Sequence, residues 1–412
     1  MHDEIDNTAS PPDEKLEYKA LALKKGEDAR LRAGHLWVFS NEVDVRKTPL
    51  TAFAPGEAAV VVDHADKPIG VAYVNPASLI CARLMARGLK HPIDKSLIVH
   101  KLKVALGLRE KLYGEPYYRL VYGEADGLPG LVLDRFGDVV VGQIATVGME
   151  ALKDAVTAAI EKVLRPRVLI WKNSGSARKL EGLPDYVDVP IGELPETVFA
   201  LEGGLKFEVD PVHGQKTGWF YDQRANRDLL GQNVSGARVL DVFSYAGAWG
   251  IRAAAFGARE VACVDASAHA CAAIRRNAEI NGMQGRVTAV EADAFDELKR
   301  LRAARERFDV VILDPPAFVK RKKDFPEGRL AYRRINEAAM QLLGRDGILV
   351  TASCSYHMPR ASLIDAINQG ARHLDRQMQV LAQLQQAPDH PVNAAIPETD
   401  YLKGYIARVL IP

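Results

Sequence analysis

One cysteine and one aspartate stand at the ends of two predicted strands, where a reaction could take place. Asp314 ends the apolar run 308-FDVVILD-314, and Cys354 directly follows the run 346-DGILVTAS-353. Parallel strands bring their carboxyl ends to one edge of a sheet, where ligands bind. A thiolate at that edge is a nucleophile, and a carboxylate can hold or share a proton. The alternative for Cys354 is a buried packing cysteine, and for Asp314 a cap of the following turn.

The other three cysteines are predicted to be structural. Cys263 lies inside a strand and Cys271 on a helix, while Cys81 belongs to an N-terminal module. No CxxC pair or histidine cluster accompanies them, so the sequence predicts no metal site and no disulfide framework. This cysteine usage is typical of a reducing cytoplasm.

Three strand-ending acids surround a glycine-containing turn. Asp241 lies in the strand 238–243, which is followed by 243-FSYAGAWG-250, and Asp265 and Asp293 end the next two strands. Acids at these positions can bind a ribose diol and an adenine amino group, and the turn leads into a helix N-terminus. An adenosine ligand is therefore expected. The spacing is not G-x-G-x-x-G, which disfavours a nicotinamide dinucleotide. The alternative interpretation is that the three acids cap helices.

The fourth strand end continues into 314-DPPAFVKRKK-323. Pro315 and Pro316 make the backbone rigid, and Phe318 can stack on or wall a flipped base. From 320 to 334 there are seven Lys or Arg residues against two acids, which suits phosphate. The four basic residues expected to bind substrate are Lys320, Arg321, Lys322 and Lys323. The alternative is a solvated surface loop.

Elements that position these residues fall into blocks. Residues 18–92 contain short strand-like runs at 58–63, 69–74 and 79–85 and predict a small β-rich module. Residues 93–195, with a predicted hairpin over 130–144 and a predicted helix over 149–164, indicate a compact α+β unit. Residues 196–412 alternate strands with helices, which predicts a doubly wound, mainly parallel α/β sheet of the Rossmann-like kind. The 412 residues carry a formal net charge of +1, so any nucleic-acid surface is local. Residues 1–17 predict a disordered tail, with no signal peptide or membrane span.

Together these motifs resemble class I S-adenosylmethionine-dependent methyltransferases. Residues 241–250 match the first motif of that family, Asp265 and Asp293 its ribose and adenine acids, and 314-DPPAF-318 its fourth motif. More narrowly, 214-GQKTGWFYDQRANR-227 and 351-TASCS-355 resemble the RlmI-like branch, bacterial enzymes that make 5-methylcytidine in large-subunit (23S) ribosomal RNA. That branch has an N-terminal PUA domain, and 33-AGHLWVFSNEV-43 is similar to the start of one.

The resemblance implies roles for individual residues. Cys354 would add to cytosine C6 and Asp314 would hold the amino and N3 edge of the base, whereas no residue is assigned to remove the C5 proton. The residues expected at S-adenosylmethionine are Asp241, Phe243, Tyr245, Gly247, Asp265, Asp293, Gln223, Arg224 and Asp314. Residues 216–227 precede the first strand of the sheet and resemble the segment that covers the cofactor in the family. Within this covering segment, Lys216, Tyr221, Gln223 and Arg224 could reach the methionine carboxylate or the RNA. In the PUA-like domain, the expected RNA face contains Arg30, Arg32, His35 and Trp37.

Other functions stay open at this point. A methyltransferase of another RNA base, such as guanine N7, needs no thiolate because that nitrogen is already nucleophilic. A non-catalytic RNA-binding or ribosome-assembly factor would keep the fold without binding the cofactor. A nicotinamide oxidoreductase is a third alternative. The expected partner is large-subunit ribosomal RNA, without membrane or metal, and a homodimer through the N-terminal or central block is compatible with the sequence.

Overall fold

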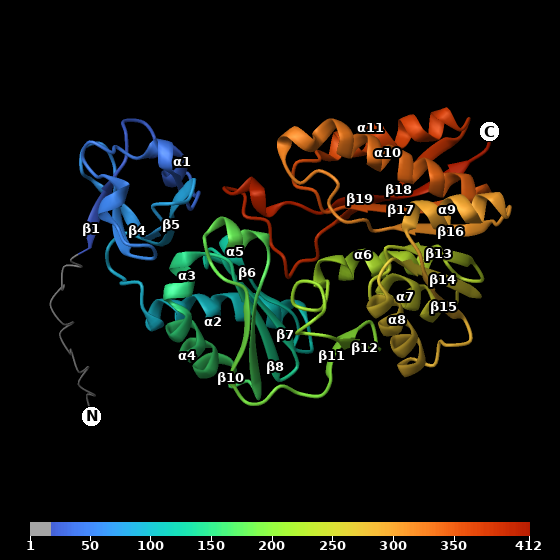
Figure 1. Ribbon diagram of the computed structural model, residues 1–412, viewed down its shortest axis with the longest axis horizontal. Coiled ribbons are helices and arrows are strands. Elements are labelled where there is room, and N and C mark those ends of the chain that lie inside the picture. The colour runs from blue at the N-terminus through green and yellow to red at the C-terminus, as the bar shows by residue number, and fades with distance from the viewer. Residues whose placement is uncertain (1–17) are drawn as a thin grey trace, which may run out of the picture.

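The computed structural model describes residues 18–412, which form three parts arranged along the chain (Figure 1). The disordered tail expected for 1–17 lies outside the described residues. The boundaries proposed at 92 and 195 fall between elements, since 92 lies between β5 and α2 and 195 between β10 and β11. We propose that residues 18–92, 93–195 and 196–412 are three domains. Within residues 18–412 no helix combines the length and apolarity that a bilayer crossing requires.

The N-terminal part is a five-stranded sheet in the order β1-β3-β4-β5-β2. Its strands are β1 (Lys19–Ala22), β2 (Trp37–Phe39), β3 (Ala58–Val62), β4 (Pro68–Val74) and β5 (Ile80–Arg87), with one short helix, α1 (Ala29–Arg32). The predicted runs 58–63, 69–74 and 79–85 thus become three adjacent strands. Apolar side chains from these strands, including Val38, Val61 and Leu84, fill a separate small core.

The central part is a five-stranded sheet in the order β10-β9-β8-β7-β6, covered by helices. The strands are β6 (Tyr117–Tyr122), β7 (Leu131–Phe136), β8 (Val139–Ile144), β9 (Val168–Asn173) and β10 (Tyr186–Ile191), and the helices are α2 (Lys95–Leu112), α3 (Val147–Ala151), α4 (Lys153–Leu164) and α5 (Ser176–Leu180). The predicted hairpin over 130–144 is confirmed as β7 and β8. The predicted helix over 149–164 is divided, because α3 ends before Leu152 and α4 begins after it.

The C-terminal part contains a seven-stranded sheet in the order β15-β14-β13-β16-β17-β19-β18. The strands are β13 (Arg238–Val242), β14 (Glu260–Asp265), β15 (Val287–Glu291), β16 (Phe308–Leu313), β17 (Leu343–Ser353), β18 (Gln377–Gln385) and β19 (Lys403–Leu410). Strands β13 to β17 pair in parallel, which confirms the Rossmann-like prediction. Strand β19 is antiparallel to both neighbours and was not predicted. A two-stranded hairpin, β11 (Val198–Glu202) and β12 (Leu205–Val209), precedes the sheet.

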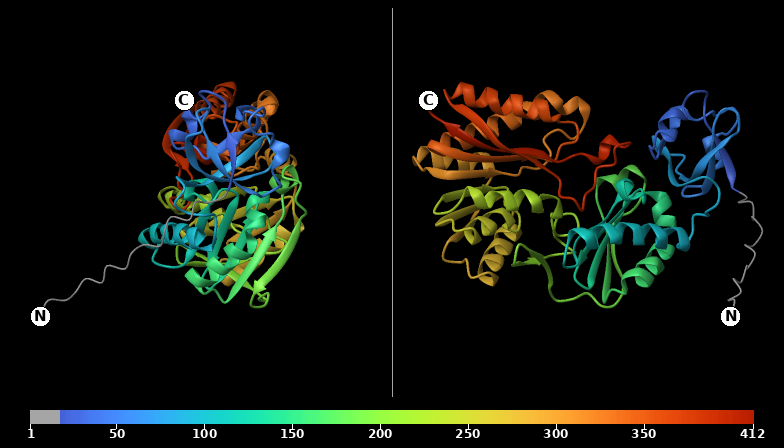
Figure 2. Two further views of the ribbon diagram at one scale, coloured as in Figure 1. Left: turned by 90° about the vertical axis from the view of Figure 1, so that its left-hand side faces the viewer. Right: turned by 180° about the vertical axis from the view of Figure 1, so that it is seen from behind.

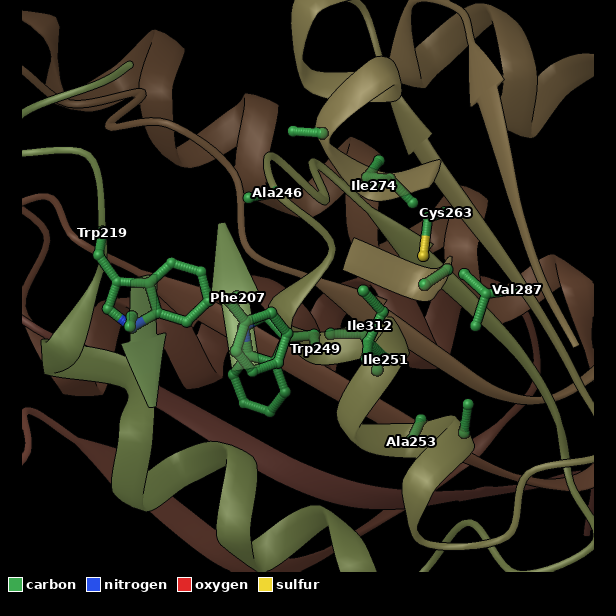
Figure 3. Close-up of a cluster of buried hydrophobic side chains, with 14 of the residues drawn as sticks. Phe207, Trp219, Ala246, Trp249, Ile251, Ala253, Cys263, Ile274, Val287 and Ile312 are labelled. Carbon is green, nitrogen blue, oxygen red and sulfur yellow. The ribbon is translucent and has the colours of Figure 1, made fainter. Parts of the chain in front are cut away.

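Helices cover both faces of this sheet. They are α6 (Arg224–Leu229), α7 (Ala248–Ala255), α8 (Ala268–Ile280), α9 (Ala294–Ala303), α10 (Phe325–Leu342) and α11 (Arg360–His373). Successive strand residues face opposite sides. Val239 therefore packs in the cluster of α7 and α8, while Leu240 packs in the cluster of α9, α10 and α11. Figure 3 shows part of the first cluster, with Trp249 from α7 near Ile312 of β16.

Residues 386–402 run from β18 to β19 and join the three parts (Figures 1 and 2). The Arg109 side chain of α2 donates to the Asp389 carbonyl at 2.7 Å, and the Tyr122 hydroxyl donates to the Thr399 carbonyl at 3.0 Å. His35 of the N-terminal part lies 3.5 Å from the Glu398 carboxylate. The C-terminal segment therefore fixes the central part against the seven-stranded sheet.

Candidate functional site

A cavity of about 490 Å³ lies at the carboxyl ends of the parallel strands. It lies where β13 and β16 are neighbours, which is the point at which the strand order reverses. Residues that line it and were expected from the sequence are Lys216, Gln223, Phe243, Tyr245, Asp265, Asp293, Asp314, Pro315, Pro316 and Cys354. Among those that were not expected are Trp219, Phe220, Asp222, Trp249 and Leu402. Segments distant in the sequence thus meet around one volume.

The two glycines of the turn do not line the cavity. A Cβ on Gly250 would lie 2.3 Å from Cys263 Sγ, so this glycine lets α7 pack closely on the sheet. Gly247 has a φ of +79°, which favours glycine, and does not line the cavity. Asp241 is fully buried below the turn, where its Oδ2 accepts from the Gly250 amide at 3.0 Å. Gly247 and Asp241 therefore support the conformation of the turn without lining the cavity.

The turn itself is strained at two large residues. Phe243 and Tyr245 have φ values of +66° and +49°, in the left-handed region that L-residues disfavour. The Tyr245 amide donates to Asp265 Oδ2 at 2.9 Å, which helps to hold the turn. Strain of this kind concentrates at ligand sites, where the surrounding structure supports it. Both residues line the cavity.

Asp265 and Asp293 differ in their relation to the helices. Asp293 is the N-cap of α9, and its Oδ1 accepts from the Phe295 amide at 2.9 Å. The cap of α8 is Ser267, so Asp265 is not a cap. Both acids nevertheless line the cavity, and helix capping engages only one oxygen of Asp293. The capping interpretation is therefore correct for Asp293 without excluding a ligand.

Asp314 is held from two sides. Its Oδ1 accepts from Gln223 Nε2 at 2.9 Å, and its Oδ2 accepts from Trp249 Nε1 at 3.1 Å. Burial raises the pKa of Asp314 to about 6, while these two hydrogen bonds oppose the increase. The carboxyl group can therefore change protonation state near neutral pH, in a fixed orientation.

Cys354 is half-buried on the same cavity, whereas Cys81, Cys263 and Cys271 are buried. Burial raises the pKa of the Cys354 thiol, and the nearby ammonium of Lys216 opposes that effect. The Lys403 Nζ donates to the carbonyl of Ser355, the residue after Cys354, at 2.8 Å. Lys403 thus ties β19 to the loop that carries the cysteine, a contact for which the sequence had no signal.

Lys216 lines the cavity together with a second cation, Arg227, which is paired with a buried glutamate. Its Nζ lies 3.7 Å from Asp222 Oδ2 and 4.5 Å from the centroid of the Phe220 ring. Asp222 is buried, accepts a hydrogen bond from the Tyr401 hydroxyl, and its pKa is held below the ordinary value by Lys216 and other neighbours despite the cost of burial. Lys216 is about half exposed, so its ammonium stays available to an anion.

Two expected residues of the covering segment point elsewhere. The guanidinium of Arg224 donates to the Tyr117 carbonyl and lies over the rings of Tyr113 and Tyr221, at 4.6 and 4.9 Å from their centroids. Tyr221 is buried, and its hydroxyl donates to the Arg135 carbonyl at 2.9 Å. Neither lines the cavity. The structure therefore places Arg224 between the central and C-terminal parts and outside the lining of the cavity.

Ala317 still lines the cavity, and the chain leaves it from Phe318 onward. Phe318 packs on Tyr332, with ring centroids 4.8 Å apart, and does not line the cavity. The side chains of 320–323 are exposed, and Arg321 pairs with Asp324 at 3.1 Å. The basic run is therefore a solvent-facing rim beside α10. Its surface position is compatible with both the phosphate and the solvated-loop interpretation.

The N-terminal cations expected at RNA have internal partners. Arg30 pairs with Glu42 at 2.8 Å, and Arg32 pairs with Asp63 at 2.8 Å. The Trp37 indole donates to Glu124 of the central part at 2.9 Å. His35 is buried at 3% exposure. These side chains stabilise the domain and its docking instead of forming a free cationic face.

The cavity can hold an S-adenosyl ligand on the structural observations alone. Two carboxylates, Asp265 and Asp293, lie at neighbouring strand ends and suit a ribose and an adenine amino group. Lys216 suits a carboxylate. The volume lies within the range of sites for small ligands. In the part of the chain that the structure describes, no group of three potential metal ligands occurs.

Family models match two regions of the chain. Residues 184–397 match the model described as S-adenosylmethionine-dependent methyltransferase, and residues 21–87 match the model of a PUA-like domain. The first match covers the hairpin β11–β12 and most of the seven-stranded sheet, with every residue of the cavity named above except Leu402. The second covers the N-terminal sheet.

Individual relatives match over almost the whole chain. A protein named Ribosomal RNA large subunit methyltransferase I from Shewanella amazonensis is 36% identical over 94% of this chain and 99% of its own. One with the same name from Shigella dysenteriae is 37% identical over 95% of this chain and 99% of its own. The crystal structure of SMU.776 complexed with SAH is 22% identical, with a TM-score of 0.81 over 95% of this chain and 100% of that one. The last similarity supports the fold.

Proposed function

The chain belongs to the family of S-adenosylmethionine-dependent methyltransferases, and from this premise we propose that it methylates cytosine C5 in large-subunit ribosomal RNA. Relatives at 36–37% identity over nearly the full chain bear the name of a large-subunit ribosomal RNA methyltransferase. The cytosine assignment rests on one observation: Cys354 and Asp314 line the same cavity as Asp265 and Asp293.

A thiol is needed because cytosine C5 is a poor nucleophile. The Cys354 thiolate would add to C6, forming an S–C bond and moving the electron pair to C5. C5 would then take the methyl group that S-adenosylmethionine supplies, and cleavage of the sulfur–methyl bond would leave S-adenosylhomocysteine. Loss of the C5 proton to a base and cleavage of the S–C6 bond would release the methylated cytosine and restore the thiolate. Overall, the cytosine gains one methyl group and loses one proton.

The cavity contains groups for each of these requirements except the base that removes the C5 proton. Asp314 would hold the amino and N3 edge of cytosine, and its pKa of about 6 allows it to share a proton with N3 as C6 is attacked. Pro315 and Pro316 form the wall beside it. Lys216 favours the thiolate form of Cys354 against the effect of burial. Asp265 and Asp293 would hold the ribose and adenine of the cofactor.

The test combines product analysis with a covalent trap. Wild type, Cys354→Ala and Cys354→Ser would be incubated with unmodified large-subunit ribosomal RNA, and nucleosides identified by mass spectrometry. We expect 5-methylcytidine from the wild type only. RNA carrying 5-fluorocytidine should form a stable protein–RNA adduct with the wild type, because fluorine cannot leave C5 as a proton does. Neither variant should form it.

Binding of S-adenosylmethionine serves as the control, since neither substitution removes a proposed cofactor contact. A methylated guanine that persists in Cys354→Ala would contradict the cytosine mechanism while leaving the family assignment intact. Absence of any RNA product from a wild type that binds the cofactor would contradict the ribosomal RNA substrate in the tested form.

A further inference from the structure

A second cavity, of about 590 Å³, lies between the end of β5 and the first turns of α2. Its lining combines apolar side chains with basic ones, and the apolar group comprises Met85, Leu97 and Val104. The basic group is Arg87, His91, His100 and Lys101. The volume is ample for one nucleotide, since sites for small ligands start at about 300 Å³. This junction cleft is remote from Cys354 in sequence and shares no lining residue with the methyl-transfer cavity.

The acids in the junction cleft already have partners. Asp126 is held by two nitrogens of Arg109, at 2.6 and 2.8 Å, and Asp94 accepts from the Leu97 amide as the N-cap of α2. Among residues 18–412, no carboxylate lies within ion-pair distance of the Lys101 ammonium, and burial, which lowers its pKa, is not offset by any neighbouring acid. Lys101 is therefore a partly desolvated cation without a counter-charge.

The Lys101 ammonium lies close to the loop after η3 (Gly123–Asp126), since a Cβ on Gly127 would be only 2.8 Å from Nζ. Arg87, which also lines the cleft, is exposed and donates through one guanidinium nitrogen to the Leu31 carbonyl at 2.9 Å. Two cations from different parts thus face one volume.

The walls of the junction cleft are rigidly connected. Arg83 of β5 pairs with Glu181 of the central part at 3.1 Å, and the Tyr73 hydroxyl donates to the Pro129 carbonyl at 2.9 Å. Charge also concentrates here: residues 87–103 contain five Lys or Arg and one acid, in a chain with a net charge of +1. An anionic ligand is the chemistry that such a preformed basic cleft recognises.

We propose that the junction cleft binds one nucleotide of the RNA substrate, with its phosphate on Lys101 and Arg87 and its base against Met85, Leu97 and Val104. The inference rests on the proposed RNA substrate and adds a contact outside the methyl-transfer cavity. An unstacked base of a single-stranded segment can enter such a cleft, whereas a paired base cannot. The phosphate contact positions the RNA, and it adds affinity for any sequence.

Lys101→Met tests the phosphate contact, because methionine keeps the apolar stem and removes the charge. Lys103→Met is the matched control, since Lys103 is exposed on the same helix and outside the cleft. Binding of the full-length protein to a large-subunit ribosomal RNA fragment would be measured over a series of salt concentrations. We expect Lys101→Met to weaken binding about 5- to 10-fold and to reduce the salt slope by about 1, and Lys103→Met to change affinity less than about 2-fold.

A second variant fills the volume without changing charge. Ser96→Trp, at an exposed residue that lines the cleft, should weaken RNA binding to a similar extent. Thermal unfolding checks that each variant is folded. Equal effects of Lys101→Met and Lys103→Met, or normal RNA binding by Ser96→Trp, would overturn the proposal. The proposal would also be overturned if Lys101→Met lost the binding of adenosine monophosphate but kept the RNA affinity of the wild type. The cleft would then be a site for a free nucleotide.

The result is separable from the methylation test. At saturating RNA, Lys101→Met should keep the kcat of the wild type and raise only KM, because the cleft does not contact the reacting atoms. If the wild type binds RNA through this cleft but methylates another base, the cytosine proposal fails and the junction cleft stands. If the wild type binds no RNA, both fail.

Discussion

Trp249 Nε1 donates a hydrogen bond to Asp314 Oδ2 at 3.1 Å, so a side chain of the hydrophobic core orients the carboxylate at the reactive edge. The indole packs among buried residues of α7, α8 and the sheet, as Figure 3 shows. Gln223 holds the other oxygen from the covering segment. The orientation and acidity of Asp314 therefore depend on two elements separate from its own strand.

Trp249→Phe should shift the pH dependence of methyl transfer. The ring volume is largely kept, but the carboxylate loses a donor, so the pKa of Asp314 rises above its value of about 6. Because the protonated form, which would share its proton with cytosine N3, then persists to a higher pH, we expect the limb of kcat/KM at which Asp314 loses its proton to move upward by about 1 unit. Trp171→Phe, whose indole donates to Thr157 in the central part, is the matched control and should leave the limb in place.

Asp241→Asn should stabilise the protein at alkaline pH. Burial raises the pKa of Asp241 to about 7 from its ordinary 3.8, and Oδ1 has no hydrogen-bond partner among the described residues. The folded state prefers the protonated form, so the wild type loses stability as pH rises through about 7. Asparagine keeps an acceptor for the Gly250 amide without the charge.

Urea unfolding at several pH values checks this prediction. The advantage of Asp241→Asn should be small near pH 4 and grow toward pH 8, with an upper bound of about 4 kcal/mol from the pKa difference. A difference between the two proteins that is independent of pH would contradict it.

Lys216→Met and Arg224→Met should separate cofactor binding from stability. Lys216 faces the cavity, so its loss should weaken S-adenosylmethionine about 10-fold if it pairs with the methionine carboxylate, since hydrogen bonds to charged groups contribute about 1.5–3 kcal/mol. Arg224 bonds to the Tyr117 carbonyl and stacks on two tyrosines. Its loss should lower the melting temperature and leave cofactor affinity unchanged. Calorimetric titration and thermal unfolding measure the two effects, and the reverse pattern would restore the original assignment of Arg224.

Lys403→Met should slow the reaction of Cys354 with a small alkylating agent. Lys403 is buried, its pKa is lowered to about 8, and it holds the Ser355 carbonyl next to the cysteine. Below pH 8 the ammonium is mostly charged and favours the thiolate, so its removal should raise the pKa of Cys354 further. Alkylation rates from pH 6 to 10, followed by mass spectrometry, give the shift. Lys403→Arg should retain most of the wild-type rate, and equal rates in all three proteins would exclude an effect of the charge.

Much of this protein could be predicted from local sequence patterns. Alternation of apolar segments predicted the parallel sheet, and acids at the ends of its strands predicted the binding edge, because parallel strands must present their carboxyl ends together. For the same reason, the structure brings Asp265, Asp293, Asp314 and Cys354 to one cavity. These positions depend on each residue's place within its own strand.

Tertiary structure alone decided which side chains near that edge face the ligand. Arg224 and Gln223 are adjacent in sequence, yet Arg224 stacks on Tyr113 of the central part and on Tyr221, whereas Gln223 holds Asp314. Lys403 reaches the cysteine loop only because β19 inserts beside β17. Lys101 and Arg87 line one cleft only because the N-terminal and central parts pack together. Such contacts join residues far apart in the chain, so their partners are set by packing and not by any local pattern of residues.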